Sequence, residues 1–239
     1  MGETQGEATS IGILMLETRF PRIPGDVGNA RTWPFPVRYR VVPGATPEAV
    51  VRGDPTTLMK AFVEAGQALI DQGCDGIATT CGFLVPLQDR LAAALGVPVA
   101  TSSLMQVPAV QATLPAGRRV GILTIAADSL TAGHLSAVGV AVDTPVVGTA
   151  PEGAFAATFL GDRPTIDVSA CRADMLEAAD RLSATAPDLG AIVLECTNMA
   201  PYAAAIRRRT GLPVYSIYSF MLWFQAGLAP RRFAASPDD

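Results

Sequence analysis

The chain contains two stretches that are built alike: Gly76-Ile77-Ala78-Thr79-Thr80-Cys81-Gly82-Phe83 and Ala191-Ile192-Val193-Leu194-Glu195-Cys196-Thr197-Asn198. In each, a short apolar run ends at a cysteine that small or polar residues follow. This pattern is typical of a buried parallel strand that opens into a loop at its carboxyl end. Both stretches therefore predict a strand of a parallel sheet with a cysteine at the strand's end.

The residues that follow the two cysteines repeat as well. A proline stands five residues after each cysteine, where it suits the first turn of a helix. Fifteen residues after each cysteine, Gly96 and Gly211 introduce a second short apolar run. The chain thus contains one strand–cysteine–helix–glycine–strand unit twice, at the same internal spacing.

Alternating patterns extend this unit into two similar halves. Strands are predicted at 11–16, 35–42, before Cys81, and at 97–100, 119–124, 140–147, 191–195 and 213–217. Helices are predicted at 54–72, 86–95, 103–114, 128–138, 170–185, 201–210 and 220–228. Strands that alternate with helices indicate an α/β fold with parallel sheets flanked by helices.

The repeat predicts two pseudo-symmetric lobes with the active site in the cleft between them. Residues 11–116, with the C-terminal helix 218–228, are assigned to the lobe that carries Cys81. Residues 117–217 are assigned to the lobe that carries Cys196. Ligands of such sheets bind beyond the carboxyl ends of the strands, so both cysteines are expected to enter one cleft. Residues 1–9 and the tail after Pro230 are predicted to be disordered.

Composition limits the partners of this chain. Of its 239 residues, 49% are hydrophobic and 17% are charged, and the formal net charge is −4. These values favour a compact protein and argue against nucleic acid or an anionic membrane as the main partner. With no signal peptide and no apolar run of transmembrane length, we expect a cytoplasmic protein with reduced thiols. Association into a homo-oligomer is left open.

The four cysteines and the single histidine do not have metal-ligand spacing, so no metal site is predicted. Cys74 and Cys171 are interpreted as small apolar residues on or beside helices. No cofactor is predicted either. Gly25 and Gly28 do not continue into a dinucleotide-binding motif, and the one lysine, Lys60, lies within a predicted helix.

The segment 18–34 is a long loop rich in proline and glycine, and loops of this length often cover binding sites. We therefore consider it a candidate lid over the cleft. Its arginines, Arg19, Arg22 and Arg31, could bind a substrate anion or could be solvated charges.

The repeat and the motif Cys196-Thr197-Asn198 resemble the aspartate/glutamate racemase superfamily over roughly residues 11–228. Its members include hydantoin racemase, maleate isomerase and arylmalonate decarboxylase. The resemblance implies a cofactor-independent racemase or epimerase that acts on a small carbon acid bearing a carboxylate. In that mechanism Cys81 and Cys196 would remove and return a proton on opposite faces of the carbon. A helix N-terminus after each cysteine would lower the thiol pKa.

Substrate contacts are predicted around both cysteines and at the ends of the first strand of each half. The predicted residues are Thr80, Gly82, Phe83, Thr197, Asn198, Glu17, Thr18 and Thr124. Two alternatives stay open: a cis–trans isomerase with one nucleophilic cysteine, like maleate isomerase, and an idle protein that binds a small acid. A decarboxylase is less favoured because it needs one proton donor only.

Four residues have both a structural and a functional interpretation. Thr80 and Thr197 could be β-formers and helix caps. Strand alternation would point the Glu195 side chain away from Cys196, so a structural role is favoured for this residue. His134 could face the cleft, but a histidine on a surface helix is the preferred interpretation.

Overall fold

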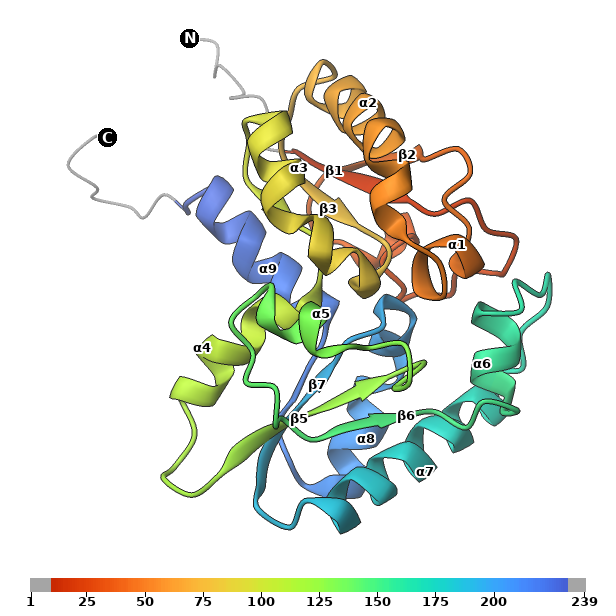
Figure 1. Ribbon diagram of the computed structural model, residues 1–239, viewed down its shortest axis with the longest axis vertical. Helices are drawn as coiled ribbons and strands as arrows, with labels where there is room; N and C mark the ends of the chain where they lie inside the picture. The colour runs from red at the N-terminus through yellow and green to blue at the C-terminus, as the bar shows by residue number, and fades with distance from the viewer. Residues whose placement is uncertain (1–9, 232–239) are drawn as a thin grey trace, which may run out of the picture.

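The computed structural model describes residues 10–231. The predicted tails at 1–9 and 232–239 lie outside the described residues. Two parallel four-stranded sheets form the centres of two lobes, and the predicted two-lobed α/β fold is confirmed (Figure 1). The first sheet has the order β2-β1-β3-β4 and the second the order β6-β5-β7-β8, so the halves share one topology.

The strands of the first sheet are β1 (Ser10–Met15), β2 (Val37–Val41), β3 (Cys74–Thr79) and β4 (Val99–Ala100). Those of the second sheet are β5 (Arg119–Thr124), β6 (Val146–Gly148), β7 (Leu189–Leu194) and β8 (Val214–Tyr215). Cys74 begins β3, so its expected place on or beside a helix is wrong. Of the strand predicted at 140–147, only the last residues belong to a strand, β6, because residues 142–144 make a turn.

The helices of the first half are α1 (Pro47–Val51), α2 (Met59–Ile70), α3 (Gln88–Leu95) and α4 (Val107–Ala112). Those of the second half are α5 (Ala132–Ser136), α6 (Ala154–Phe159), α7 (Val168–Thr185), α8 (Ala203–Thr210) and α9 (Ile217–Leu228). Short 3₁₀ helices are η1 (Ala30–Thr32), η2 (Pro55–Leu58), η3 (Gly82–Leu87), η4 (Ser103–Gln106) and η5 (Thr197–Tyr202). The sequence did not predict α1 or α6, because a helix of five or six residues shows less than two turns of periodicity.

The duplicated unit has the same local structure in both halves. Each cysteine precedes a 3₁₀ helix, η3 or η5, that contains the repeated proline and passes directly into α3 or α8. Both α-helices end at a glycine in the left-handed region, with φ of 67° at Gly96 and 74° at Gly211. That conformation suits glycine and reverses the chain toward the next strand, which explains the repeated glycine.

The last helix returns to the first sheet. In α9, Ile217, Phe220 and Met221 are buried in an apolar cluster with Ile11 and Ile13 of β1. Figure 1 shows this helix in blue beside the elements of the first half. Full burial of each such side chain contributes roughly 1.5–3 kcal/mol, so α9 helps to hold the two halves of the chain together.

Within residues 10–231, no helix is both long enough and apolar enough to cross a membrane. Across the same residues, no group of three or more histidine, cysteine, aspartate or glutamate side chains is arranged to hold a metal ion.

Candidate active site

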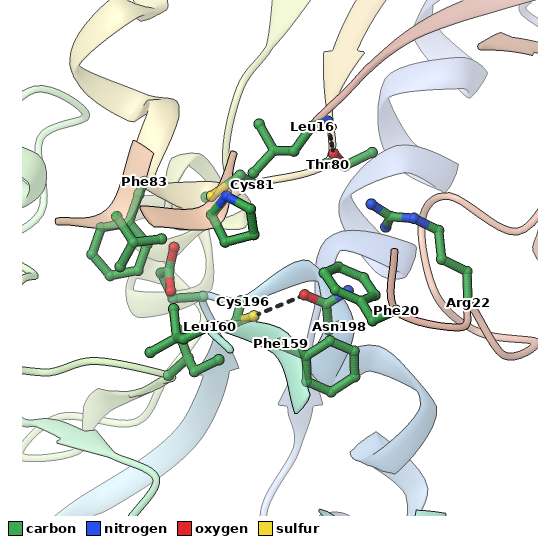
Figure 2. Close-up of a pocket in the computed structure, with 15 residues that line it drawn as sticks. Leu16, Phe20, Arg22, Thr80, Cys81, Phe83, Phe159, Leu160, Cys196 and Asn198 are labelled. Carbon is green, nitrogen blue, oxygen red and sulfur yellow. Dashed lines mark hydrogen bonds between the residues drawn. The ribbon is translucent and has the colours of Figure 1, made fainter. Parts of the chain in front are cut away.

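The two repeated cysteines lie at equivalent positions, two residues beyond the ends of β3 and β7. Cys81 and Cys196 occupy the positions directly before the N-termini of η3 and η5. Both line one pocket between the lobes, and Figure 2 shows their sulfur atoms at its centre. The structure therefore brings together two residues that are 115 positions apart in the chain.

The pocket is narrow. It encloses about 30 Å³, which holds water but not a small organic ligand. Two phenylalanines meet edge to face across the lobes: the ring centres of Phe20 and Phe159 are 4.9 Å apart. Beside them, Arg19 forms an ion pair with Asp162 at 2.9 Å. The segment 18–34 and the end of α6 meet at these contacts, so their separation would enlarge the pocket for a ligand.

Four of the predicted substrate contacts line the pocket and four do not. The lining residues are Thr80, Gly82, Phe83 and Asn198. The others have different contacts. The Thr197 hydroxyl donates to the Thr80 carbonyl at 2.7 Å, and the Arg22 guanidinium donates to Thr18 at 3.1 Å. Glu17 accepts from the Gly44 N–H at the surface, and Thr124 donates to Glu195.

A buried polar network lies at one side of the pocket. Asp26, which is 1% exposed, accepts from the Arg22 guanidinium at 2.9 Å, from the Gly28 N–H at 2.7 Å and from the Asn198 amide at 2.6 Å. Arg22 also lies over the Phe20 ring, 4.8 Å from its centre. Arg22 is thus a largely buried part of the pocket. Arg19 and Arg31 are exposed, in agreement with their interpretation as charges on a surface loop.

This network also orients the Cys196 thiol. The Asp26 carboxylate can only accept, so the NH₂ group of Asn198 must face it and the amide oxygen must face the other way. That oxygen lies 3.5 Å from the Cys196 sulfur, and the thiol donates to it. Cys196 is therefore held in its protonated form.

Burial, and not the helix N-terminus, determines the acidity of both thiols. Burial, followed by the nearby Glu195 charge, raises the pKa of Cys81 to about 12. The same two causes raise the pKa of Cys196 well above its usual value. The N–H groups of Phe83 and Asn198 act in the opposite direction and are outweighed. The expectation of lowered thiol pKa values is wrong, because burial in the narrow pocket desolvates the thiolates.

Glu195 is a pocket residue, contrary to the structural role expected of it. Strand β7 ends at Leu194, so strand alternation does not extend to Glu195. The side chain is 0% exposed and lines the pocket, with Oε2 accepting from Thr124 at 2.8 Å. The other oxygen, Oε1, lies against Gly82 and has no hydrogen-bond partner within the described chain. Burial raises the pKa of Glu195 to about 7.

This raised pKa predicts a pH-dependent stability. The Glu195 carboxyl group loses its proton near pH 4.5 in the unfolded chain and at about pH 7 in the folded protein. In that window the folded state binds more protons, so the free energy of unfolding falls as the pH rises, by roughly 3 kcal/mol in all. Urea unfolding of wild type and Glu195→Gln across the window measures it. A constant difference between the two proteins would contradict the assignment.

His134 lies outside the thiol pocket. Its ring meets Phe83 edge-on, with ring centres 5.5 Å apart, and accepts from the Thr131 N–H at the start of α5. It lines a separate surface groove, and partial burial lowers its pKa. The preferred interpretation as a histidine on a surface helix agrees with this placement.

Comparison with known proteins identifies the family. No family model matches the chain. Dimethylsulfoniopropionate lyase 7 of Emiliania huxleyi (strain CCMP1516) is 32% identical over 233 residues, which span 93% of this chain and 68% of that protein. A dimethylsulfoniopropionate lyase of Durusdinium sp. clade D is 30% identical over 86% of this chain and 70% of that protein. The chain belongs to the dimethylsulfoniopropionate lyase family.

Solved structures agree with the predicted superfamily at the level of fold. Arylmalonate decarboxylase superimposes with a TM-score of 0.62 at 18% identity, over 95% of this chain and 96% of that one. Allantoin racemase from Pseudomonas fluorescens gives a TM-score of 0.59 at 15% identity, over 92% and 90%. The resemblance to the aspartate/glutamate racemase superfamily is thereby confirmed for the fold.

The predicted racemase or epimerase function is wrong, and so is the isomerase class. The relatives that share 30–32% of their residues with this chain are dimethylsulfoniopropionate lyases. The reason for the error is chemical. Two facing thiols indicate proton transfer at a carbon acid, but they do not determine what happens to the carbanion afterwards. Inversion, decarboxylation and elimination can all follow the same first step.

The sequence patterns did not identify several pocket residues of this dimethylsulfoniopropionate lyase homologue. The apolar walls include Pro47 and Val51 of α1, Phe159 of α6 and Leu160 directly after it. Such residues have the composition of ordinary core positions, and only their approach to the cysteines distinguishes them. Glu195 carried the one usable signal, a charged residue within an otherwise apolar strand end.

Proposed function

We propose that this chain is a lyase that eliminates dimethyl sulfide from dimethylsulfoniopropionate and leaves acrylate. The observation that carries this proposal is the 32% identity with a dimethylsulfoniopropionate lyase over 93% of the chain. The pocket supports it, because it combines two thiols with apolar and aromatic walls in a narrow, largely buried space.

The reaction is a β-elimination. A thiolate takes a proton from the carbon next to the carboxylate, and the electrons of that C–H bond form the carbon–carbon double bond. The bond between the next carbon and the sulfonium sulfur breaks, and the sulfur leaves with its electron pair as neutral dimethyl sulfide. The thiol later releases the proton to water. The step needs a base and no electron acceptor, so the proposal includes no cofactor.

Cys81 is the base in this proposal. Burial and the Glu195 charge raise the pKa of Cys81 to about 12, while the Phe83 N–H and the Arg22 charge favour its thiolate. The Cys196 thiol, by contrast, donates its proton to Asn198 and is held in the neutral form. A cation that enters the pocket would stabilise the Cys81 thiolate further, since Coulomb attraction is strong where water is excluded.

The two sides of the pocket suit the two ends of this substrate. In Figure 2, Arg22 and Asn198 lie on one side of the two cysteines and Phe83 on the other. The bonds from Arg22 to Asp26 and Thr18 leave further donors on its guanidinium for a carboxylate. With its carboxylate at Arg22, the substrate would present the adjacent carbon to the thiols and its sulfonium group to Phe83.

The segment 18–34 acts as the lid of this pocket. Its contacts with the second lobe, Phe20 with Phe159 and Arg19 with Asp162, separate to admit the substrate and close again over it. Closure excludes water from the thiolate and the forming carbanion. The natural partner is thus a small carboxylate. The four free cysteines suit the reducing cytoplasm.

The decisive test supplies purified protein with dimethylsulfoniopropionate. We expect dimethyl sulfide in the headspace, measured by gas chromatography, and an equal amount of acrylate in solution, measured by NMR. Dimethylsulfonioacetate is the matched control, because it has the same two charges but lacks the second carbon that elimination requires. Absence of both products at millimolar substrate would refute the proposal.

A further inference from the structure

The elimination proposed above assigns no role to Glu195, although this buried carboxylic acid lines the pocket. It is fully buried, lines the cavity, and is held by Thr124 through one carboxylate oxygen only. The second oxygen has no hydrogen-bond partner among residues 10–231. A buried carboxylate with a free oxygen costs several kcal/mol unless it is paired, so a group that supplies the missing partner would bind there.

The charged and titratable groups around this carboxylate leave it without a cation. Cys81 and Cys196 are neutral thiols at physiological pH, since burial raises the pKa of both. Arg22 is paired with Asp26 at 2.9 Å, so these two charges largely cancel. His134 lies behind Phe83 and is bound to Thr131. The Glu195 carboxylate is therefore the uncompensated charge of the pocket.

The walls of the same pocket suit a cation. Three phenylalanine rings line it, Phe20, Phe83 and Phe159. The faces of aromatic rings attract alkylated cations such as quaternary ammonium groups. The Arg22 guanidinium, 4.8 Å from the centre of the Phe20 ring, already makes such a contact. Aromatic rings together with one buried carboxylate would bind an alkylated cation and disfavour a neutral group of the same shape.

We propose that Glu195 is the counter-ion of the substrate's sulfonium group and selects substrates that carry a positive charge at that end. This inference rests on the proposed elimination. With the carboxylate at Arg22 and the sulfonium at Glu195, the carbon that loses its proton lies between the two ends, beside the cysteines. Breaking the carbon–sulfur bond removes the positive charge, so dimethyl sulfide no longer pairs with Glu195. The loss of this attraction favours product release.

Two ligands of equal shape and different charge test the inference by binding alone. The first is 3-(trimethylammonio)propionate, and the second is 4,4-dimethylpentanoate, in which a carbon replaces the nitrogen. By calorimetry at about pH 8, wild type should bind the cationic ligand about 10- to 100-fold more tightly, as typical for a charge-assisted contact. In Glu195→Gln the ratio of the two affinities should fall to the smaller preference that the aromatic rings alone provide. Glutamine keeps the size of the side chain and can still accept from Thr124.

Glu177→Gln is the control variant. Glu177 is an exposed residue of α7 that pairs with Arg181 and does not line the pocket, so this change removes one solvent-screened negative charge and should leave the ratio unchanged. A preference that is undiminished in Glu195→Gln would overturn the inference. Failure of wild type to bind either ligand at millimolar concentration, or to distinguish them, would overturn it as well.

A second variant keeps the test valid if Glu195→Gln does not fold. Thr124→Val removes the hydroxyl that stabilises the Glu195 carboxylate and retains the shape of the side chain. Because Glu195 must be ionised to attract the cation, the preference should appear as the pH rises through about 7 in wild type. In Thr124→Val the same transition should move to higher pH, and an unmoved transition would contradict the assignment.

The binding ratio also separates this inference from the proposed function. If dimethyl sulfide is released but the ratio does not depend on Glu195, the inference fails and the lyase activity stands. If the ratio depends on Glu195 but no dimethyl sulfide is formed, the lyase proposal fails. Glu195 then remains the counter-ion for a cationic small acid.

Discussion

Replacing Cys81 by serine should slow the release of dimethyl sulfide about 10²–10⁴-fold, the contribution typical of one acid or base group. A serine hydroxyl has nearly the shape of the thiol, but it loses its proton far less readily. The base is therefore lost while the shape of the pocket is retained. The effect should fall on kcat, because the carboxylate and sulfonium contacts of the substrate are not changed. Steady-state kinetics of dimethyl sulfide release measures it.

Cys74→Ser is the matched control for this prediction. Cys74 begins the same strand, β3, is buried and free, and contacts the Ser10 hydroxyl instead of the pocket. Its replacement should leave kcat unchanged. In Cys196→Ser the hydroxyl can still donate to Asn198, so we expect a smaller loss than in Cys81→Ser. A larger loss in Cys196→Ser would reverse the assignment of the base.

Replacing Asp26 by asparagine should lower the free energy of unfolding by about 3–5 kcal/mol, the cost typical of breaking a buried ion pair from one side. The carboxylate accepts from Arg22, Gly28 and Asn198 at once, and asparagine offers one acceptor oxygen and no charge. Arg22 would be left as a largely buried, unpaired cation, with its side chain only 10% exposed. Urea unfolding at neutral pH gives this value.

Activity should fall together with stability in Asp26→Asn, because Arg22 and Asn198 lose the group that positions them. The matched control is Asp162→Asn, which breaks the exposed ion pair that Arg19 of the same segment makes. Asparagine tolerates the left-handed backbone at position 162, where φ is 48°. Exposed pairs contribute about 0–1 kcal/mol, so a destabilisation equal to that of Asp26→Asn would contradict the buried-pair assignment.

The fold was predictable because its signals are local and periodic. Apolar runs that end at Cys81 and Cys196, followed by helices that end at Gly96 and Gly211, specify each strand–helix–strand unit within a few dozen residues. Repetition of the unit then indicated two lobes. Each cysteine follows the carboxyl end of a strand, where parallel sheets bind ligands, and the carboxyl ends of the two sheets face each other so that both cysteines line one pocket.

The chemistry of the site was less predictable, because proton removal is common to many reactions. Thr197 has the sequence context of a substrate contact, but its hydroxyl binds the Thr80 carbonyl of the other lobe. The helix N-termini at both cysteines are present as expected, yet burial outweighs them and raises the thiol pKa values. The degree of desolvation depends on how completely the two lobes close.

The sequence by itself determined the two parallel sheets, the repeated strand–helix–strand unit and the positions of the two thiols, since short-range patterns of apolar residues encode them. Tertiary structure alone decided which residues surround those thiols. Asp26 meets Asn198 across 172 positions of the chain, and Glu195 packs against Gly82 of the other lobe. Such contacts depend on how the lobes dock, and that docking makes Glu195 a buried, unpaired charge.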